Sequence, residues 1–306
     1  MDNILLQTEN LCKKFGNFTA LDNVSISLQK GHIYGFIGEN GAGKSTLMKI
    51  LTGLSFPTSG TMRIFGESDE KGIRRVLSRI GSVIEAPALH PDYTVYENVN
   101  IQRILAKNPD KKICDDTLEL VGLADVKNKK AKTLSMGMKQ RLSIALALVS
   151  KPQLMILDEP INGLDPLNIA QFRKIIKTLN EDGITFFISS HILSELFLIA
   201  TDYIIIHKGK IMKTITHEEL ETQCKKCLRI KVNDASAGVV VLENELGTQS
   251  YKVAPNNIIY LYSHLNEVEK VSRVLTDNHI LITGLSLSED SLEDYFFSVI
   301  GGKAND

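Results

Sequence analysis

At residues 38–46 the chain runs Gly38-Glu39-Asn40-Gly41-Ala42-Gly43-Lys44-Ser45-Thr46, directly behind the apolar run Ile33–Ile37. The spacing G-x-x-x-x-G-K-[ST], after a strand and before a helix, is typical of a loop that binds phosphate. Glycines let this backbone curl tightly enough to point several N–H groups inward, at the positive end of the following helix. Lys44 adds a positive charge, and Ser45 offers a hydroxyl group to Mg²⁺. The segment therefore predicts a site for a nucleoside triphosphate.

Two carboxylates end a second apolar strand further along the chain, where residues 154–159 read Leu-Met-Ile-Leu-Asp-Glu. In a parallel sheet, the last residues of a buried strand lie at the edge that binds the ligand. We expect Asp158 to hold Mg²⁺ through water. Glu159, one residue on, is placed to polarise the water that attacks the nucleotide. The pair indicates a hydrolytic site.

Between these motifs lies Leu134-Ser135-Met136-Gly137-Met138-Lys139-Gln140-Arg141, followed by the apolar run Leu142–Val149. Ser135 is a good N-cap residue for a helix that starts there, and the free N–H groups of such a start can take up an anion. With this third motif the chain resembles the ATP-binding subunit of an ABC transporter, and Leu134–Gln140 is similar to that family's signature motif. The resemblance covers roughly residues 4–220.

The resemblance implies further roles. Two such subunits sandwich two ATP molecules head to tail, so that Ser135 and Gly137 contact the γ-phosphate bound to the partner's loop. Phe15 stacks on adenine, and His191, after the strand Ile184–Ser189, is the hydrogen-bond partner of the γ-phosphate. The segment Gly163-Leu164-Asp165 matches the loop that lines the dimer seam. Each has a plainer alternative: Phe15 as core, His191 as a surface histidine, and Asp165 as a helix N-cap before Pro166.

Two departures from the commonest family pattern carry information. Glu85 stands where most members have glutamine, after the strand that leads to the helical subdomain. A carboxylate there binds Mg²⁺ more strongly than an amide, but it also repels the γ-phosphate and Glu159. Glu85 is thus a candidate for both catalysis and metal binding. Met136 replaces the first of the two signature glycines.

A narrower resemblance concerns the exported cargo. The segments Val83–Leu89, Ser135–Arg141 and Ser291–Phe296 resemble the subgroup that exports bacitracin or confers lantibiotic immunity. Exporters of other cargo share parts of this pattern, so an ABC subunit for another cargo stays open. The resemblance implies ATP and Mg²⁺ as cofactors, a second ATP-binding subunit, expected to be another copy of this chain, and a membrane permease as partners.

The alternation of strands and helices predicts an α/β core, and the resemblance implies the full fold class: a P-loop NTPase with an antiparallel β subdomain, a helical subdomain and a small C-terminal α+β domain. Strands at Leu5–Leu11, Val24–Leu28 and Thr61–Phe65 form the antiparallel part. Helical periodicity from Thr94, which starts a capping box, marks a helical subdomain at about residues 86–150. Beyond residue 220, the order βαββαβ predicts a ferredoxin-like domain at residues 221–306.

Composition is consistent with this organisation. A chain of 306 residues suggests two domains at roughly 150 residues each. A net charge of −1 argues against nucleic acid as the main partner. No apolar run reaches the roughly 18 residues needed to span a bilayer, so transport requires a separate permease, with this chain as a peripheral protein on the cytoplasmic face of the membrane. The pair Cys224 and Cys227 has zinc-knuckle spacing but lacks a second ligand pair.

The sequence thus predicts an ATPase that drives a separate permease, with Lys44, Asp158, Glu159 and His191 in its site. A soluble ABC ATPase acting on ribosomes or DNA is one alternative, although the chain has neither a second cassette nor long coiled coils. A scaffolding subunit that does not hydrolyse ATP is another, disfavoured because all four of these residues are present.

Overall fold

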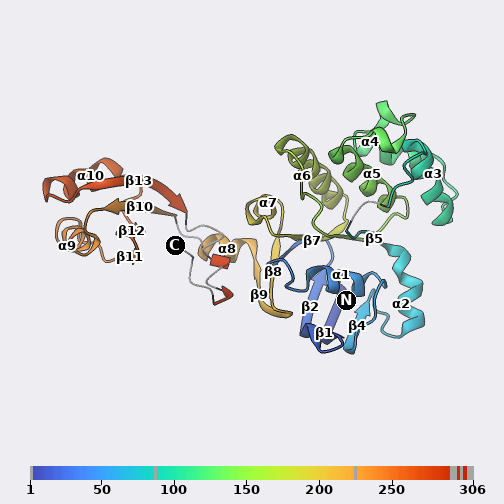
Figure 1. Cartoon of the computed structure of the whole chain (residues 1–306), viewed down its shortest axis with the longest axis horizontal. Coiled ribbons are helices and arrows are strands. Elements are labelled where there is room, and N and C mark those ends of the chain that lie inside the picture. The colour runs from blue at the N-terminus through green and yellow to red at the C-terminus, as the bar shows by residue number, and fades with distance from the viewer. Residues whose placement is uncertain (1–2, 86–87, 224–225, 290–294, 297–298, 302–306) are drawn as a thin grey trace. The chain divides into compact units, whose positions relative to one another are not determined.

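The computed structural model describes residues 3–85, 88–223, 226–289, 295–296 and 299–301. The chain divides into two compact units, Met1–His217 and Glu218–Asp306 (Figure 1). Helix α8 (His217–Gln223) contains this boundary. Among the described residues, no helix combines the length and the apolar character needed to cross a membrane.

A six-stranded sheet forms the centre of the first unit, in the order β5-β6-β7-β3-β8-β9. Its strands are β3 (Ile33–Ile37), β5 (Ile80–Val83), β6 (Leu154–Leu157), β7 (Thr185–Ser190), β8 (Asp202–His207) and β9 (Lys210–Thr216). All neighbours are parallel except β8 and β9, which form an antiparallel hairpin. Every residue of β3, β6 and β7 is buried, as expected for parallel strands covered on both faces. The segments after these strands therefore meet at one edge of the sheet.

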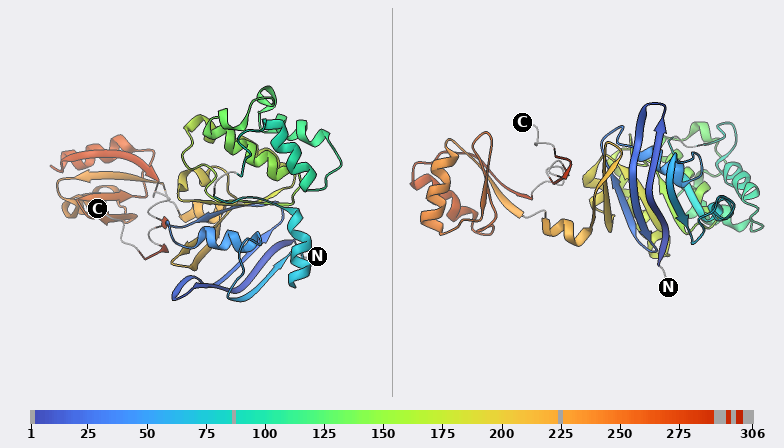
Figure 2. Two further views of the ribbon diagram at one scale, coloured as in Figure 1. Left: turned by 45° about the vertical axis from the view of Figure 1, so that its right-hand side comes forward. Right: turned by 90° about the horizontal axis from the view of Figure 1, so that it is seen from below.

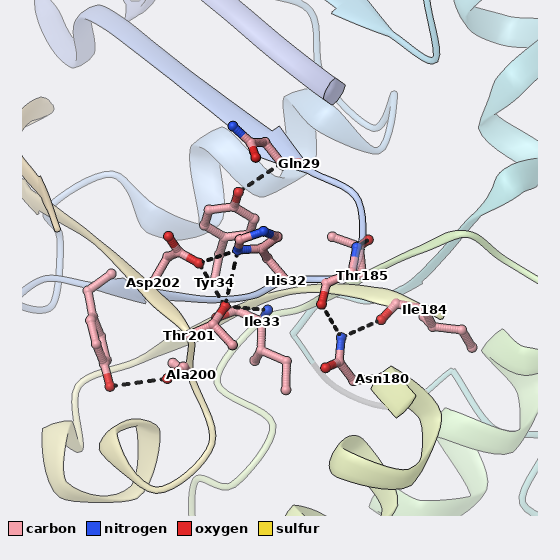
Figure 3. A network of polar contacts seen from close by, with 12 residues as sticks. Gln29, His32, Ile33, Tyr34, Asn180, Ile184, Thr185, Ala200, Thr201 and Asp202 are labelled. Atoms are coloured by element: carbon pink, nitrogen blue, oxygen red, sulfur yellow. Dashed lines mark hydrogen bonds and ion pairs between the residues drawn. The ribbon is translucent and has the colours of Figure 1, made fainter. Parts of the chain in front are cut away.

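Polar contacts close the opposite edge, where the parallel strands begin (Figure 3). His32 Nδ1, just before β3, lies 2.6 Å from Asp202 Oδ2, and the Thr201 hydroxyl donates to the same oxygen over 2.7 Å. Thr201 Oγ1 also accepts a hydrogen bond from the Ile33 N–H. These bonds tie the starts of β3 and β8 together, at the edge opposite the one where the segments after β3, β6 and β7 meet.

A three-stranded antiparallel sheet packs beside the central one, in the order β2-β1-β4. It consists of β1 (Ile4–Phe15), β2 (Phe18–Gln29) and β4 (Ser59–Ile64). Helix α1 (Lys44–Leu51) lies between the two sheets (Figures 1 and 2), and its buried apolar residues join both in one hydrophobic cluster. The hairpin β1–β2 extends beyond the predicted strands because register irregularities, with Asn10 and Asn23 at positive φ, interrupt the alternation that marks a strand in sequence.

The helices α3 (Val95–Leu105), α4 (Lys112–Leu120) and α5 (Met136–Leu148) pack on one another, as Figure 1 shows. The predicted capping box is confirmed: Thr94 accepts from the Glu97 N–H, and the Glu97 carboxylate accepts from the Thr94 N–H. The predicted N-cap of α5 is also confirmed, since Ser135 accepts from the Met138 N–H. The first unit also contains α2 (Glu70–Val76), α6 (Pro166–Glu181) and α7 (Leu193–Phe197).

The second unit has the predicted order βαββαβ. Its elements are β10 (Lys226–Val232), α9 (Ala235–Leu246), β11 (Tyr251–Ala254), β12 (Ile258–Leu261), α10 (Val268–Asp277) and β13 (Ile282–Glu289). All strand pairs are antiparallel in the order β11-β12-β10-β13, and both helices pack against this sheet and each other. This is the ferredoxin-like arrangement. Cys224, residues 86–87 of the segment Val83–Leu89 and residues 291–294 of the segment Ser291–Phe296 lie outside the described residues.

Candidate nucleotide site

The loop between β3 and α1 has the geometry that the sequence predicted. Gly41 and Gly43 have φ values of 82° and 109°, in the left-handed region that glycine adopts without strain. A Cβ atom on Gly43 would lie 2.7 Å from the Ala20 carbonyl oxygen, and one on Gly38 would lie 2.6 Å from the Ile206 carbonyl oxygen. A Cβ on Gly41 would meet no described atom within 4 Å. The loop is thus packed tightly at its base and open at Gly41.

Helix α1 begins inside this loop with Gly43 as N-cap, and none of the described side chains caps it. Its first N–H groups are therefore available to an anion. Lys44 is 6% exposed, and its ammonium group donates to the carbonyl oxygens of Gly38 (2.6 Å) and Glu39 (3.3 Å). Ser45 and Thr46 follow in the first turn and are half-buried. The positive charge of Lys44, the free N–H groups of α1 and the open space at Gly41 fit the phosphates of a nucleotide.

Ser189 links the Asp158 carboxylate to the backbone of Glu159, the two residues that follow β6. Its hydroxyl group, fully buried in β7, donates to Asp158 Oδ1 over 2.6 Å and accepts from the Glu159 N–H over 2.8 Å. Asp158 is itself 4% exposed. Ser189 is a site residue that the sequence motifs do not predict. The available signal was a serine at the end of an apolar strand, two residues before His191.

Glu159 lies between a lysine and a histidine. Its Oε1 is 3.2 Å from Lys44 Nζ, without the alignment of a hydrogen bond, and no described group donates to this buried oxygen. Its Oε2 is 2.8 Å from His191 Nδ1. Glu159 has a φ of 47°, a conformation that costs energy for a residue with a side chain and is held by its surroundings. The structure thus brings Lys44, Glu159 and His191 together, as a hydrolytic site requires.

The described residues contain no group of three or more His, Cys, Asp or Glu side chains arranged to hold a metal ion. Mg²⁺ bound with a nucleotide needs only one or two protein oxygens, because phosphates and water supply the rest. Ser45 and Asp158 fit that requirement. Glu85 has a φ of 61° and its Oε1 lies 2.5 Å from Lys49 Nζ. In the described structure it contacts Lys49 rather than Asp158 or Glu159.

The start of α5 packs on the start of α6. A Cβ atom on Gly137 would lie 2.3 Å from Cγ of Asn168, so the helices could not approach as closely with a larger residue. Asp165 is the predicted N-cap of α6 and accepts from the Asn168 N–H over 2.9 Å, which lowers the pKa of its carboxyl group. A Cβ on Gly163 would lie 3.1 Å from Cε of Met136. The signature segment and the Gly163–Asp165 loop are therefore neighbours within one chain.

Phe15 lies at the tip of the β1–β2 hairpin and is 54% exposed, so it is not a core residue. The ammonium group of Lys13 is 4.9 Å from the centre of its ring. An exposed aromatic ring of this kind can stack on a nucleotide base.

Comparisons with known proteins agree with this geometry. The family model described as ABC transporter matches residues 21–162. The bacitracin transport ATP-binding protein BcrA of Bacillus licheniformis is 42% identical over 299 residues, which cover 97% of this chain and 98% of that protein. The lantibiotic transport ATP-binding protein SrtF of Streptococcus pyogenes is 44% identical over 208 residues, 68% of this chain and 89% of that protein.

Among solved structures, a dimeric ATP-binding cassette in a post-hydrolysis state, bound to ADP and Pi, superimposes with a TM-score of 0.63 at 27% identity. The match covers 69% of this chain and 98% of that one. These relatives confirm the family and the subgroup that the motifs predicted, and they do not favour the alternative of an ATPase acting on ribosomes or DNA. ABC transporter subunits of this kind form dimers and work with a membrane permease. The chain therefore belongs to the ABC transporter family, as one of its ATP-binding, ATP-hydrolysing subunits.

Proposed function

We propose that this chain powers the export of a peptide antibiotic of the bacitracin or lantibiotic kind. It acts with a separate membrane permease, as a peripheral protein on the cytoplasmic face of the membrane. The names of the relatives BcrA and SrtF support the cargo class. The single observation that carries the chemistry is the meeting of Lys44, Glu159 and His191 beside the open phosphate loop.

In this proposal the loop Gly38–Thr46 binds the triphosphate through its N–H groups and Lys44, and Phe15 stacks on the adenine. Ser45 and Asp158 hold Mg²⁺, which when bound neutralises charge on the phosphate oxygens. Ser189 keeps the Asp158 carboxylate in place, since its hydroxyl group is bonded to Oδ1.

Glu159 is the general base. Its Oε1 is buried and paired with Lys44 Nζ at 3.2 Å but accepts no hydrogen bond from a described group, so in this proposal it accepts from the attacking water once Lys44 turns to the phosphates. His191 fixes the carboxylate through Oε2 and, in this assignment, turns to the γ-phosphate when the site closes. Glu85 remains a candidate for the same site, on condition that it leaves Lys49.

Hydrolysis is coupled to transport by closure of two copies of this chain. Ser135 and the backbone at Gly137 face the nucleotide bound to the partner copy. A ligand shifts a conformational equilibrium only by binding one state better than the other, and ATP contacted by both copies does so for the closed pair. Closure then moves the permease.

The test of the base is Glu159→Gln, which keeps the shape of the side chain but cannot accept a proton. Loss of a general base lowers turnover by about 10²- to 10⁴-fold, whereas ATP affinity should stay close to that of the wild type. Glu195→Gln is the matched control, because Glu195 has similar exposure (24% against 21%) and an ion pair with Arg173, away from the loop. Normal turnover in Glu159→Gln would remove this residue from the mechanism.

The test of the cargo uses cells that are sensitive to bacitracin and to a lantibiotic. Co-expression of this chain with its permease should raise resistance to one of them, and Glu159→Gln in the same pair should abolish the gain. The chain expressed alone should give no resistance. Resistance without the permease, or stable co-purification with ribosomes, would contradict the proposal.

A further inference from the structure

A second aromatic residue lies opposite Phe15 in the β1–β2 hairpin. The turn is Gly16-Asn17, and the pair that flanks it is Phe15 and Phe18, whose Cα atoms are partners in the antiparallel register. Directly opposite residues of an antiparallel pair project from the same face, with Cβ atoms about 4.5–5.5 Å apart. The two rings therefore belong to one face of the hairpin tip.

Both rings are open to solvent, which is unusual for phenylalanine. Phe15 is 54% exposed and Phe18 is 62% exposed. Neither side chain belongs to the hydrophobic cluster that the rest of the hairpin builds with α1. Packing of the protein interior thus does not explain why either residue is aromatic.

The hairpin is fixed directly against the phosphate loop. A Cβ atom on Gly43 would touch the Ala20 carbonyl oxygen at 2.7 Å and the Leu21 side chain at 2.9 Å. Phe18 precedes Ala20 by two residues of strand, a rise of about 7 Å. A nucleotide whose phosphates lie in the loop can therefore extend its base to the hairpin tip, where both rings are exposed.

The ring of Phe15 is held on one side by Lys13. The ammonium group of Lys13 donates to the Phe56 carbonyl oxygen over 2.7 Å and also lies 4.9 Å from the centre of the Phe15 ring. A cation over one face of a ring occupies that face. The other face of Phe15 and the ring of Phe18 are left for a planar ligand.

We propose that Phe18 is a specificity-determining residue that contacts the purine base together with Phe15. The inference rests on the proposed binding of the triphosphate by the loop Gly38–Thr46. It adds a second aromatic side chain, beside Phe15, in contact with the base. Stacking of one base on an aromatic side chain changes affinity by about 5- to 150-fold when the ring is removed. Phe18 contributes through its ring, so an aliphatic residue of similar volume does not replace it.

The experiment measures binding to the full chain by calorimetry with two probes, ATP and inorganic tripolyphosphate, both with Mg²⁺. Phe18→Ala and Phe18→Leu should weaken ATP binding within the 5- to 150-fold range expected for a lost stack and leave tripolyphosphate binding unchanged. Phe18→Tyr should bind ATP like the wild type. Tyr93→Ala is the matched control, because Tyr93 is also an exposed aromatic residue (48%) but precedes α3 instead of flanking the hairpin turn.

Three results would overturn the inference: unchanged ATP affinity in Phe18→Ala, wild-type affinity in Phe18→Leu, or an equal loss for both probes, which would place the effect at the loop. Failure of the proposed triphosphate binding by the loop Gly38–Thr46 is distinguishable, since the wild type would then bind neither ATP nor tripolyphosphate. If the wild-type chain binds tripolyphosphate as tightly as it binds ATP, the triphosphate site stands and the contact with the base is overturned.

Discussion

Replacement of Gly137 by alanine tests whether the start of α5 is held against α6. In most helices this change stabilises the folded state by about 0.5–1 kcal/mol, because alanine restricts the unfolded chain. Gly137 is buried, and its added Cβ would lie 2.3 Å from both Cγ and Oδ1 of Asn168. The structure therefore predicts the opposite sign.

The size of this destabilisation depends on how far the atoms of Asn168 must move to make room for the added Cβ. Carbon atoms pack best at about 3.5–4.0 Å, so the contact must open by more than 1 Å. Asn168 cannot turn away freely, because its Nδ2 donates to Asp165 Oδ2 over 2.7 Å and its N–H donates to Oδ1 over 2.9 Å. Added volume in a packed site costs about 1–3 kcal/mol. After subtraction of the central gain in helix propensity from the central packing cost, the free energy of unfolding should fall by about 1 kcal/mol.

Urea unfolding followed by circular dichroism measures this change. Since the chain has two compact units, the shift should appear in the transition of the first unit and leave that of the second unchanged. Asn168→Ala removes the obstructing atoms, so Gly137→Ala should cost less in that background than in the wild type. The double-mutant cycle isolates the contact between the two residues.

Gly137→Ala that is as stable as the wild type, or more stable, would refute the predicted contact. An equal cost in both backgrounds would place the strain elsewhere. ATPase activity supplies a second measure, because a displaced α5 also moves Ser135, which we assign to the partner's nucleotide.

Three further predictions use the same unfolding and ATPase measurements. Ser189→Ala removes a bond to the buried Asp158 carboxylate and one to the Glu159 N–H, so the free energy of unfolding should fall by about 2–4 kcal/mol, and a loss below 0.5 kcal/mol would contradict the bonding in the structure. The Thr94 N–H and hydroxyl group lower the pKa of Glu97 below its ordinary value of 4.5, so the stabilisation by this capping box is present above pH 4.5 and lost as the pH falls through the lowered pKa. Glu97→Gln should remove that pH dependence. If the free energy of unfolding of Glu97→Gln changes with pH as in the wild type, Glu97 is not its source. Lys49→Met should leave the free energy of unfolding within about 1 kcal/mol of the wild type, because the ion pair with Glu85 is exposed. The same variant should change the Mg²⁺ dependence of ATPase activity, and Glu85→Gln should change it more than Glu85→Asp does. ATPase activity that is the same in all three variants as in the wild type would show that Glu85 has no part in the site.

Local signals in the sequence predict the parts of the fold that local interactions determine. The caps at Thr94, Ser135 and Asp165 depend on residues three positions away, and all three are present. Helix α2 was not predicted because it spans seven residues, of which only Ile73 and Val76 are large and apolar, too few for a helical period to be recognised. Helix α7 spans five residues, too short for a period to be recognised.

The residues of the site fall into the same two groups, those that a local motif predicts and those that depend on contacts between distant parts of the chain. The loop Gly38–Thr46 is contiguous, so its spacing alone indicates phosphate binding, and strand ends predict that Asp158, Glu159 and His191 meet at one edge. The hydroxyl group of Ser189 was missed because a serine in a strand has no distinctive spacing, and its bond to Asp158 joins residues 31 positions apart. Phe18 was passed over because only Phe15 matches the family motif.

Glu85 shows how a long-range contact changes an electrostatic argument. From the sequence alone, a carboxylate in place of glutamine adds negative charge near the γ-phosphate and Glu159. In the structure Lys49, 36 residues away, lies 2.5 Å from that carboxylate and balances its charge. Lys49 follows Lys44 on the short helix α1 that begins in the phosphate loop, so Glu85 is tied to the helix that starts at the proposed nucleotide site. The contact of Glu85 with Mg²⁺ stays a prediction, which the Lys49→Met and Glu85 variants test.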